Sequence, residues 1–232
     1  DQYVIRVFGR SEDGKSVSLG FNFNPYFYVK TTRSMSGSHW KGLVKCEPVR
    51  AKDLWGFQNG ELSQFWRLEF KTHKTLRSCA YSLENEKIYE ANIDPVLRFM
   101  HVSGISSTGW IDPGECEPDV ETTCDVPLWS TDWRLVKPVA RDDIAPLRVM
   151  SFDIECYSST GAFPDPKNPL DVVFQIGMTT RAFGSTEFID RTCLCLKQTD
   201  GKDVQTFGTE RELLQAFERH LKKVDPDIIT GW

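Results

Sequence analysis

Residues 150–156 read Met-Ser-Phe-Asp-Ile-Glu-Cys, an apolar run that contains two acidic residues separated by one position. Residues i and i+2 of a β-strand point to the same face, so we expect Asp153 and Glu155 to project together and Phe152 and Ile154 to pack on the other side. Carboxylates held in this way bind Mg²⁺ or Mn²⁺, which can activate water for phosphodiester cleavage. The stretch therefore predicts a strand that carries a metal site.

The spacing of the two acids is not specific by itself. One Asp-x-Glu pair is expected by chance in a chain of this length if Asp and Glu each make up roughly 6% of residues. A second pair, Asp119-x-Glu121, lies in an acidic stretch and is interpreted as solvated charge. A surface strand with two outward-facing acids is the ordinary alternative for Asp153 and Glu155. The apolar residues around them favour a buried strand and hence the metal site.

The residues around this stretch predict an α/β domain. Thr209 and Glu212 form a Thr-x-x-Glu capping box, after which Leu213 and Phe217 lie on one helical face. Three strands, a helix and a strand are the order in which a ribonuclease-H-like exonuclease fold begins, although other α/β folds begin in the same way. Strands are expected over residues 147–156, 172–179, 186–196 and 227–230, and the helix over 209–224.

The first half of the chain is rich in short β-type runs, and a long acidic stretch follows them. Residues 111–132 contain no Lys or Arg, but they contain many acids and several prolines, which is typical of a linker. We therefore expect a β-rich domain over residues 1–140 and a second domain over 141–232, an α+β chain overall. Strands are expected over residues 3–8, 17–23, 26–30, 43–49 and 65–70, turns over 11–14 and 58–60, and a helix over 72–83.

Composition excludes several classes of protein. Hydrophobic residues make up 40% and charged residues 26%, as in globular proteins, so disorder and coiled-coil classes are not indicated. No apolar run approaches the roughly 20 residues that span a bilayer, so no membrane partner is expected. The seven cysteines form no CxxC pair and fit the reduced thiols of an intracellular protein. The start at Asp1 is neither a signal peptide nor an initiator methionine, and we expect a soluble fragment of a longer product.

Charge and the remaining side chains indicate little else. The net charge of −5 argues against a uniformly basic nucleic-acid binder. The stretch from Tyr26 to Lys52 is nevertheless basic, with Glu47 as its single acid, and either contacts a phosphate backbone or forms a solvated face. Cys193 and Cys195 are expected along one strand face without a ligand role, and the four histidines form no cluster.

Several segments resemble family B DNA polymerases, particularly the delta type. Residues 151–156, Ser-Phe-Asp-Ile-Glu-Cys, resemble the first exonuclease motif of that family. The final Asp-Pro-Asp-Ile-Ile-Thr-Gly-Trp, residues 225–232, resembles the approach to the second motif. Further similar segments occur in the same order as in the family: Pro-Tyr-Phe-Tyr at 25–28, Tyr-Glu-Ala-Asn at 89–92, Leu-Arg-Phe-Met at 97–100, Gly-Trp-Ile at 109–111, Gly-Ala-Phe-Pro-Asp-Pro at 161–166 and Gln-Ile-Gly at 175–177.

The resemblance implies a DEDD-type proofreading 3′→5′ exonuclease with four carboxylates, joined to a β-rich N-terminal domain. Asp153 and Glu155 match the first motif, which implies catalytic and metal-binding roles for both. The second motif would follow Trp232, and Asp227 precedes it, so Asp227 is not the second-motif aspartate. The resemblance thus implies a two-ion Mg²⁺ or Mn²⁺ site that is completed only in the full-length protein. We expect the chain alone to lack polymerase activity and to have at most negligible nuclease activity.

The resemblance also implies partners and a location. Phe163 occupies the place of an aromatic that holds the frayed primer end, and the alternative is that it anchors its loop on the sheet. The implied partners are primer–template DNA, the single-stranded primer end, the remaining polymerase domains of the same chain, and accessory or processivity subunits. The expected location is intracellular, and nuclear if the source is a eukaryote or a nuclear-replicating virus.

Two other functions remain open from the residues. A stand-alone nuclease of related fold would keep the carboxylates but lack polymerase domains, and the Pro-Tyr-Phe-Tyr and Leu-Arg-Phe-Met segments argue against it. A non-catalytic nucleic-acid-binding or scaffold module would make the acids incidental and the basic stretch dominant. Cellular and viral sources are equally compatible with the sequence.

Overall fold

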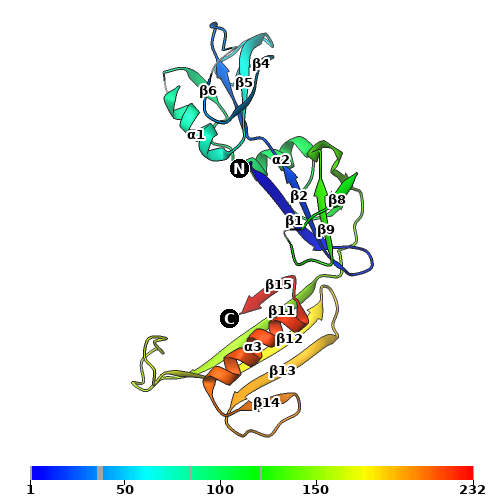
Figure 1. The fold of residues 1–232 in the computed structure, drawn as a ribbon, viewed down its shortest axis with the longest axis vertical. Coiled ribbons are helices and arrows are strands. Elements are labelled where there is room, and N and C mark those ends of the chain that lie inside the picture. The colour runs from blue at the N-terminus through cyan, green and yellow to red at the C-terminus, as the bar shows by residue number, and fades with distance from the viewer. Residues whose placement is uncertain (1, 36–38, 84, 121, 232) are drawn as a thin grey trace. The chain divides into compact units, whose positions relative to one another are not determined.

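The computed structural model of the chain describes residues 2–35, 39–83, 85–120 and 122–231. The chain divides into two compact units, drawn in Figure 1. Unit 1 comprises residues 1–8 and 17–142, and unit 2 comprises residues 9–16 and 143–232. No helix among the described residues is long and apolar enough to cross a membrane.

One part of unit 1 is a sheet built around aromatic side chains. Phe21 of β2 and Phe23, directly after that strand, pack on Phe99 of α2, with ring centroids 4.7 and 5.8 Å away. Helix α2 begins after Asp94, whose carboxylate accepts from the Val96 N–H, and it ends at Gly104 with φ +74°. The strand order is β1 (Val4–Arg10), β2 (Ser16–Asn22), β9 (Val126–Ser130) and β8 (Cys116–Pro118). Helix α2 spans Pro95–Ser103, and a 3₁₀ turn spans Trp133–Leu135. A separate pair of strands is formed by β10 (Lys137–Val139) and β7 (Trp110–Asp112).

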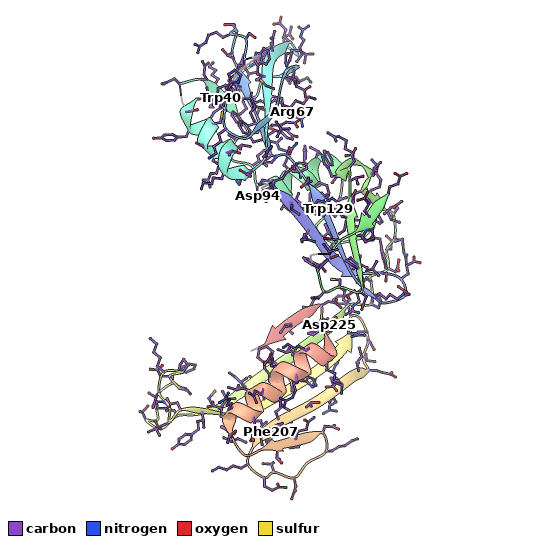
Figure 2. All side chains as sticks on the ribbon, viewed as in Figure 1. Trp40, Arg67, Asp94, Trp129, Phe207 and Asp225 are labelled. Atoms are coloured by element: carbon purple, nitrogen blue, oxygen red, sulfur yellow. The ribbon has the colours of Figure 1, made fainter. Side chains whose placement is uncertain are left out.

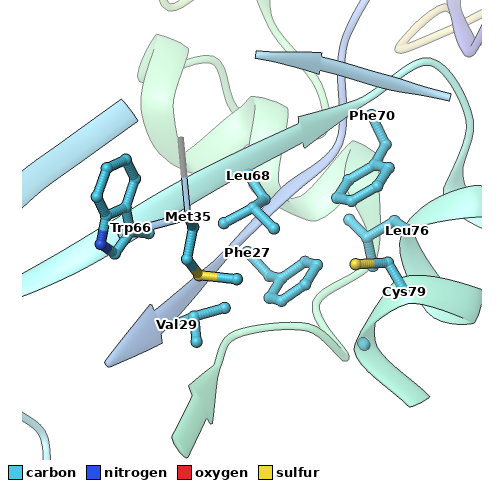
Figure 3. Close-up of a cluster of buried hydrophobic side chains, with 9 residues drawn as sticks. Phe27, Val29, Met35, Trp66, Leu68, Phe70, Leu76 and Cys79 are labelled. Carbon is cyan, nitrogen blue, oxygen red and sulfur yellow. The ribbon is translucent and has the colours of Figure 1, made fainter. Parts of the chain in front are cut away.

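The other part of unit 1 is an antiparallel sheet with α1 on one face. Figure 3 shows Leu76 and Cys79 of α1 facing the sheet residues Phe27 and Phe70, whose rings stack with centroids 5.8 Å apart. Helix α1 begins after Thr72, whose side chain accepts from the Thr75 N–H. The strand order is β4 (Leu43–Lys52), β5 (Leu62–Phe70), β3 (Tyr26–Lys30) and β6 (Lys87–Tyr89), and α1 spans His73–Ser82.

The opposite face of this sheet is polar and aromatic. Arg67, labelled in Figure 2, lies over the Tyr26 ring at 3.9 Å, and its guanidinium also pairs with Glu69 at 2.9 Å. The buried Arg98 contacts the same ring at 4.5 Å and pairs with Glu90. Cation–π contacts and ion pairs of this kind replace the interactions with water that the guanidinium groups lose when they are buried.

The connection between β4 and β5 is anchored by one carboxylate. Asp53 accepts hydrogen bonds from the Lys30 ammonium, from the Tyr89 hydroxyl at 2.9 Å and from the Trp55 backbone N–H at 3.0 Å. These donors, the Lys30 ammonium most of all, lower the pKa of Asp53 to about 2. The carboxylate therefore orders the start of the loop as long as it is ionised.

We expect this anchor to be lost in acid. The pKa of Asp53 is lower in the folded chain than in the unfolded chain, so its contribution to stability is complete above about pH 4 and disappears as the pH falls through about 2. A ¹³C NMR titration of the Asp53 carboxyl carbon checks the value. A midpoint for Asp53 near that of a free aspartate would contradict the anchor.

The acidic stretch over residues 111–132 is not a linker, and that expectation is wrong. It contains β7, β8 and β9, and β9 pairs in parallel with β2, with Leu19 opposite Leu128. Asp119 is buried and its carboxylate pairs with the Arg6 guanidinium at 2.5 Å, so it is not solvated charge. Glu121 lies outside the described residues. The base that compensates Asp119 comes from β1, far away in sequence.

Unit 2 is a mixed sheet with a helix on one face. Helix α3 (Glu210–Val224) lies along the sheet in Figure 1, and the capping box expected at Thr209 and Glu212 is present. Leu213 and Ala216 from this helix pack with Met150, Ile176 and other sheet residues. The strand order is β14 (Val204–Phe207), β13 (Phe188–Leu196), β12 (Val172–Ala182), β11 (Arg148–Tyr157) and β15 (Ile228–Gly231).

Most expected elements exist, with shifted ends. The mixed α+β class is confirmed, and so is the succession of strands, helix and final strand in unit 2, with the short strand β14 in addition. β14 adds in parallel to β13, where Leu194 lies opposite Gln205. Helix α2 was not expected, although Asp94-Pro95 before it and Gly104 after it are typical start and stop signals.

Candidate active site

The strand β11 lies between β12 and β15 and separates two kinds of side chain. Met150 is buried under α3, and the Phe152 ring lies 5.4 Å from the Phe217 ring. Ile154 is on the same face as Met150 and Phe152, but its side chain stays partly exposed, so it packs less completely than expected. The odd-numbered residues, Asp153 and Glu155 among them, therefore point to the face opposite α3.

Asp153 and Glu155 are both exposed on that open face. Asp153 Oδ1 accepts from the Ile154 backbone N–H at 2.9 Å, and Glu155 makes no hydrogen bond or ion pair with any described residue. A β-bulge follows Glu155, because Glu155 pairs with Gln175 but Cys156 pairs with Val173. Bulges re-aim the side chains beside them. The structure thus places the two predicted carboxylates together, with free oxygens.

A pocket of about 360 Å³ lies on the open face beside Asp153. Gly177 is the cross-strand neighbour of Asp153, and a Cβ added there would meet no atom within 4 Å. The pocket is also lined by Arg191 and Lys202, neither of which forms an ion pair within the described part of the chain. Asp203 lines the same space, so the pocket holds charge of both signs, and Arg191 and Lys202 are the groups in it that attract an anion. The sequence contained no signal for these two cations, which come from β13 and the turn after it.

The donor set is compatible with a hard divalent cation. Two carboxylates lie on one strand face, and their oxygens are not neutralised by a basic partner among the described residues. Within those residues no group of three or more His, Cys, Asp or Glu side chains is suited to hold a metal. Asp153 and Glu155 could supply part of a coordination shell that water and further ligands complete.

β15 runs beside β11 in the same direction. Ser151 is opposite Thr230 and Phe152 is opposite Gly231, so the end of β15 lies one residue before Asp153 along the ladder. Trp232, the last residue of the second-motif approach, lies outside the described residues. Residues at the end of β15 are therefore delivered to the neighbourhood of Asp153 by backbone pairing.

Asp227 connects segments of unit 2 through hydrogen bonds. Its carboxylate accepts from the Arg10 guanidinium at 2.5 Å and from the Arg148 N–H at 2.6 Å. Arg10 also donates to the Asp225 carbonyl. Asp227 thus joins residues 9–16, the start of β11 and the start of β15 within unit 2. Both donors bind its Oδ2, whereas neither oxygen of Glu155 has a donor among the described residues.

Phe163 is fully exposed in the connection between β11 and β12. Its side chain is 95% accessible, so it does not anchor its loop on the sheet. The loop is held by Asp171 instead, which accepts from the Ser159 and Asp165 N–H groups at 2.8 and 3.0 Å. These hydrogen bonds, the one from Asp165 first, lower the pKa of Asp171. A DNA-binding role for Phe163 stays a prediction.

One thiol, that of Cys193, also lines the pocket beside Asp153. Cys193 and Cys195 share one face of β13, with their sulfurs 3.6 Å apart. Burial and the neighbouring thiol raise the pKa of Cys193 to about 11, which keeps it protonated. His220 on α3 is buried, with its Nε2 3.2 Å from an Asp190 oxygen.

Comparison with known proteins matches residues 86–232 to the model of the DNA polymerase family B exonuclease domain. The chain belongs to DNA polymerase family B. This membership confirms the resemblance of the exonuclease segments, and the matched range includes Asp153, Glu155 and the pocket beside them. The exonuclease domains of this family are metal-dependent, in agreement with the free carboxylates on β11.

Two relatives, one viral and one cellular, are similar to nearly the whole chain. The DNA polymerase of Acanthamoeba polyphaga mimivirus is 30% identical over all of the chain and 16% of its own length. The DNA polymerase delta catalytic subunit of Schizosaccharomyces pombe is 28% identical over 98% of the chain and 24% of its own length. The chain therefore spans less than a quarter of the length of these two relatives.

A solved structure shares the fold. The family B DNA polymerase from the archaeon Pyrobaculum calidifontis matches 99% of the chain and 28% of its own length, with a TM-score of 0.68 and 23% identity. The strand-rich architecture of both units is thus that of a family B polymerase.

Proposed function

We propose that this chain is the N-terminal and proofreading segment of a DNA-directed DNA polymerase, which removes mispaired 3′ ends from primers in DNA replication. The observation that supports this most is the pair of carboxylates on the open face of β11, inside the range that matches the family's exonuclease domain. In this proposal residues 1–140 form the N-terminal domain and residues 141–232 the first part of the exonuclease domain. The polymerase domains of the parent protein complete it.

Asp153 and Glu155 are assigned as the metal ligands and catalytic carboxylates. Mg²⁺ is the cofactor of choice, with Mn²⁺ as a substitute, because both prefer carboxylate oxygens. The bound metal would polarise the phosphodiester and lower the pKa of a water. The carboxylates hold this centre with charge that no described base cancels. Two further carboxylates, from the second and third motifs, would complete a two-ion site in the parent protein.

The pocket supports binding of a DNA end. Arg191 and Lys202 present cations to the same space as Asp153, and a phosphodiester needs such cations to approach two carboxylates. Gly177 leaves this space open. Phe163 offers an exposed ring on which an unpaired terminal base can stack. The proposed substrate is therefore the single-stranded 3′ end of a primer on a primer–template.

The proposal also covers partners and location. Accessory or processivity subunits are expected to bind the parent polymerase. The protein acts inside the cell, where DNA is replicated, and in the nucleus if its source is a eukaryote or a nuclear-replicating virus.

Binding of Mn²⁺ to the chain itself tests the metal assignment. We expect weak binding, seen as loss of the free-ion electron paramagnetic resonance signal, because two carboxylates supply only part of the shell. The double variant Asp153→Asn, Glu155→Gln should lose this binding while keeping the fold, since both side chains are exposed.

A matched control separates the site from general acidity. Glu187 and Asp200 are exposed acids of unit 2 that lie outside β11 and do not line the pocket, and the variant Glu187→Gln, Asp200→Asn removes the same charge. This control should bind Mn²⁺ as the unmodified chain does. Equal loss in the two double variants would show that the ion binds the acidic surface at large, and it would remove the assignment.

A further inference from the structure

The β4–β5 connection exposes three large apolar side chains in four residues. We call residues 54–57, Leu-Trp-Gly-Phe, the loop tip. Trp55 is 75% exposed, Phe57 is 93% exposed, and Leu54 is also mostly exposed. Exposed aromatic rings in such density are unusual on a surface that has no partner. The loop tip lies in unit 1 and belongs to no part of the β11 site.

Hydrogen bonds hold the backbone of the loop tip at both ends. Asp53 fixes its start through Lys30, Tyr89 and the Trp55 N–H. The Gln58 side chain closes it by donating to the Trp55 carbonyl, and the Glu61 N–H donates to the Gln58 carbonyl at 2.8 Å. The backbone is thus ordered while its two rings stay in water. An ordered, exposed ring costs less entropy when it binds than a flexible one.

Cations next to the loop tip lack partners. Arg50 and Lys52 are exposed on β4, two residues apart and therefore on the same side of the strand. Neither makes an ion pair or a hydrogen bond with any described residue. The other bases of this region are mostly neutralised, Lys30 by Asp53, Lys45 by Glu47 and Arg33 by Glu86. Arg50 and Lys52 therefore place unpaired positive charge on the strand that leads directly into the loop tip.

We propose that the loop tip, together with Arg50 and Lys52, binds single-stranded nucleic acid. Bases stack on flat rings regardless of their sequence, and the neighbouring cations attract the phosphates. A duplex is excluded as the preferred ligand because its bases are already stacked on each other. A partner protein would gain from the apolar rings but would not need free cations two residues apart. The inference does not depend on the exonuclease site.

Binding to a fluorescein-labelled oligo(dT) of about 12 nucleotides tests this proposal by fluorescence anisotropy, at low salt and with EDTA present. Trp55→Ala and Phe57→Ala should each weaken binding about tenfold, because a stacked ring contributes roughly 1–3 kcal/mol and 1.4 kcal/mol is tenfold. A blunt duplex of the same length should bind more weakly than the single strand. Equal affinity for the duplex, or no effect of either variant, would overturn the proposal.

Two controls sharpen the test. Tyr81→Ala removes an equally exposed ring, 78% accessible, from α1 of the same unit and should leave binding unchanged. Trp55→Leu keeps an apolar side chain but removes the flat ring, so it should weaken binding almost as much as Trp55→Ala. If Trp55→Leu bound the probe as tightly as the unmodified chain, the contact with the loop tip would be hydrophobic only, and base stacking on Trp55 would be rejected. The thermal midpoints of all variants should match, since these side chains lie outside the cores.

The role of the cations is read from salt dependence. Arg50→Gln and Lys52→Gln should each reduce the slope of log affinity against log salt by roughly 0.7, the value for one phosphate contact to a single strand. Unchanged slopes in both variants would remove these residues from the site. Trp55→Ala should leave Mn²⁺ binding by Asp153 and Glu155 unchanged, so failure of this inference and failure of the proposed exonuclease are told apart.

Discussion

Replacing Asp153 and Glu155 together with alanine is expected to abolish excision of mismatched primer ends by the polymerase that contains this chain. The loss should be at least roughly a hundredfold, because removing one group that stabilises developing charge commonly costs that much and two are removed here. Polymerisation from a matched primer should persist, since its site lies elsewhere in the proposed parent protein. Single-turnover excision of a labelled, mispaired 3′ end measures the first effect, and primer extension measures the second.

A second double variant tests whether geometry or charge is responsible. Asp153→Asn with Glu155→Gln keeps shape and hydrogen bonding but removes both charges, and it should be as inactive as the alanine pair. The control Glu187→Gln, Asp200→Asn should excise normally. Excision at the unmodified rate by the alanine pair would sink the assignment of the catalytic carboxylates, whatever the metal-binding result.

Phe27→Ala is expected to lower the free energy of unfolding by about 3–5 kcal/mol. Phe27 is fully buried, and its ring stacks on Phe70 with an interplanar angle of 6°. Leu76 and Cys79 belong to the same cluster, and both come from a short helix that is held by packing more than by its own propensity. The cavity left by alanine would therefore weaken both the sheet and the helix.

Phe57→Ala is the matched control for this substitution. It removes the same atoms from a ring that is 93% exposed, so the free energy of unfolding should change by less than about 0.5 kcal/mol. Urea unfolding and calorimetry of the unit 1 transition measure the free energy of unfolding of both variants. A similar loss in the two would mean that the ring of Phe57 is packed in solution, which would also undermine the loop tip as a binding surface.

Local pattern was enough for the elements whose signals lie within a few residues. The Thr209 and Glu212 capping box predicted the start of α3, and the alternation around Asp153 predicted the face that carries both carboxylates. These features depend on i, i+2 and i, i+3 relations, which the chain carries wherever it folds. The resemblance to family B polymerases also rested on short segments, and the family match confirms it.

Long-range pairing was beyond that kind of inference. The acidic stretch looked like a linker because the base that compensates Asp119, Arg6, is more than a hundred residues away in sequence. The same distance hid β9, which is held by parallel pairing with β2. Local composition indicates charge but not its partner, so an acidic strand and an acidic linker look alike.

The sequence by itself therefore determined the family, the α+β class and the two carboxylates of β11, because each is encoded by neighbours along the chain. Only the tertiary structure decided what surrounds those carboxylates. It brought Arg191 and Lys202 into the pocket beside Asp153, engaged Asp227 with Arg10 and Arg148, and left the rings of the loop tip in water. The physical reason is that exposure and charge pairing depend on which strands become neighbours, and that is settled when the whole core packs.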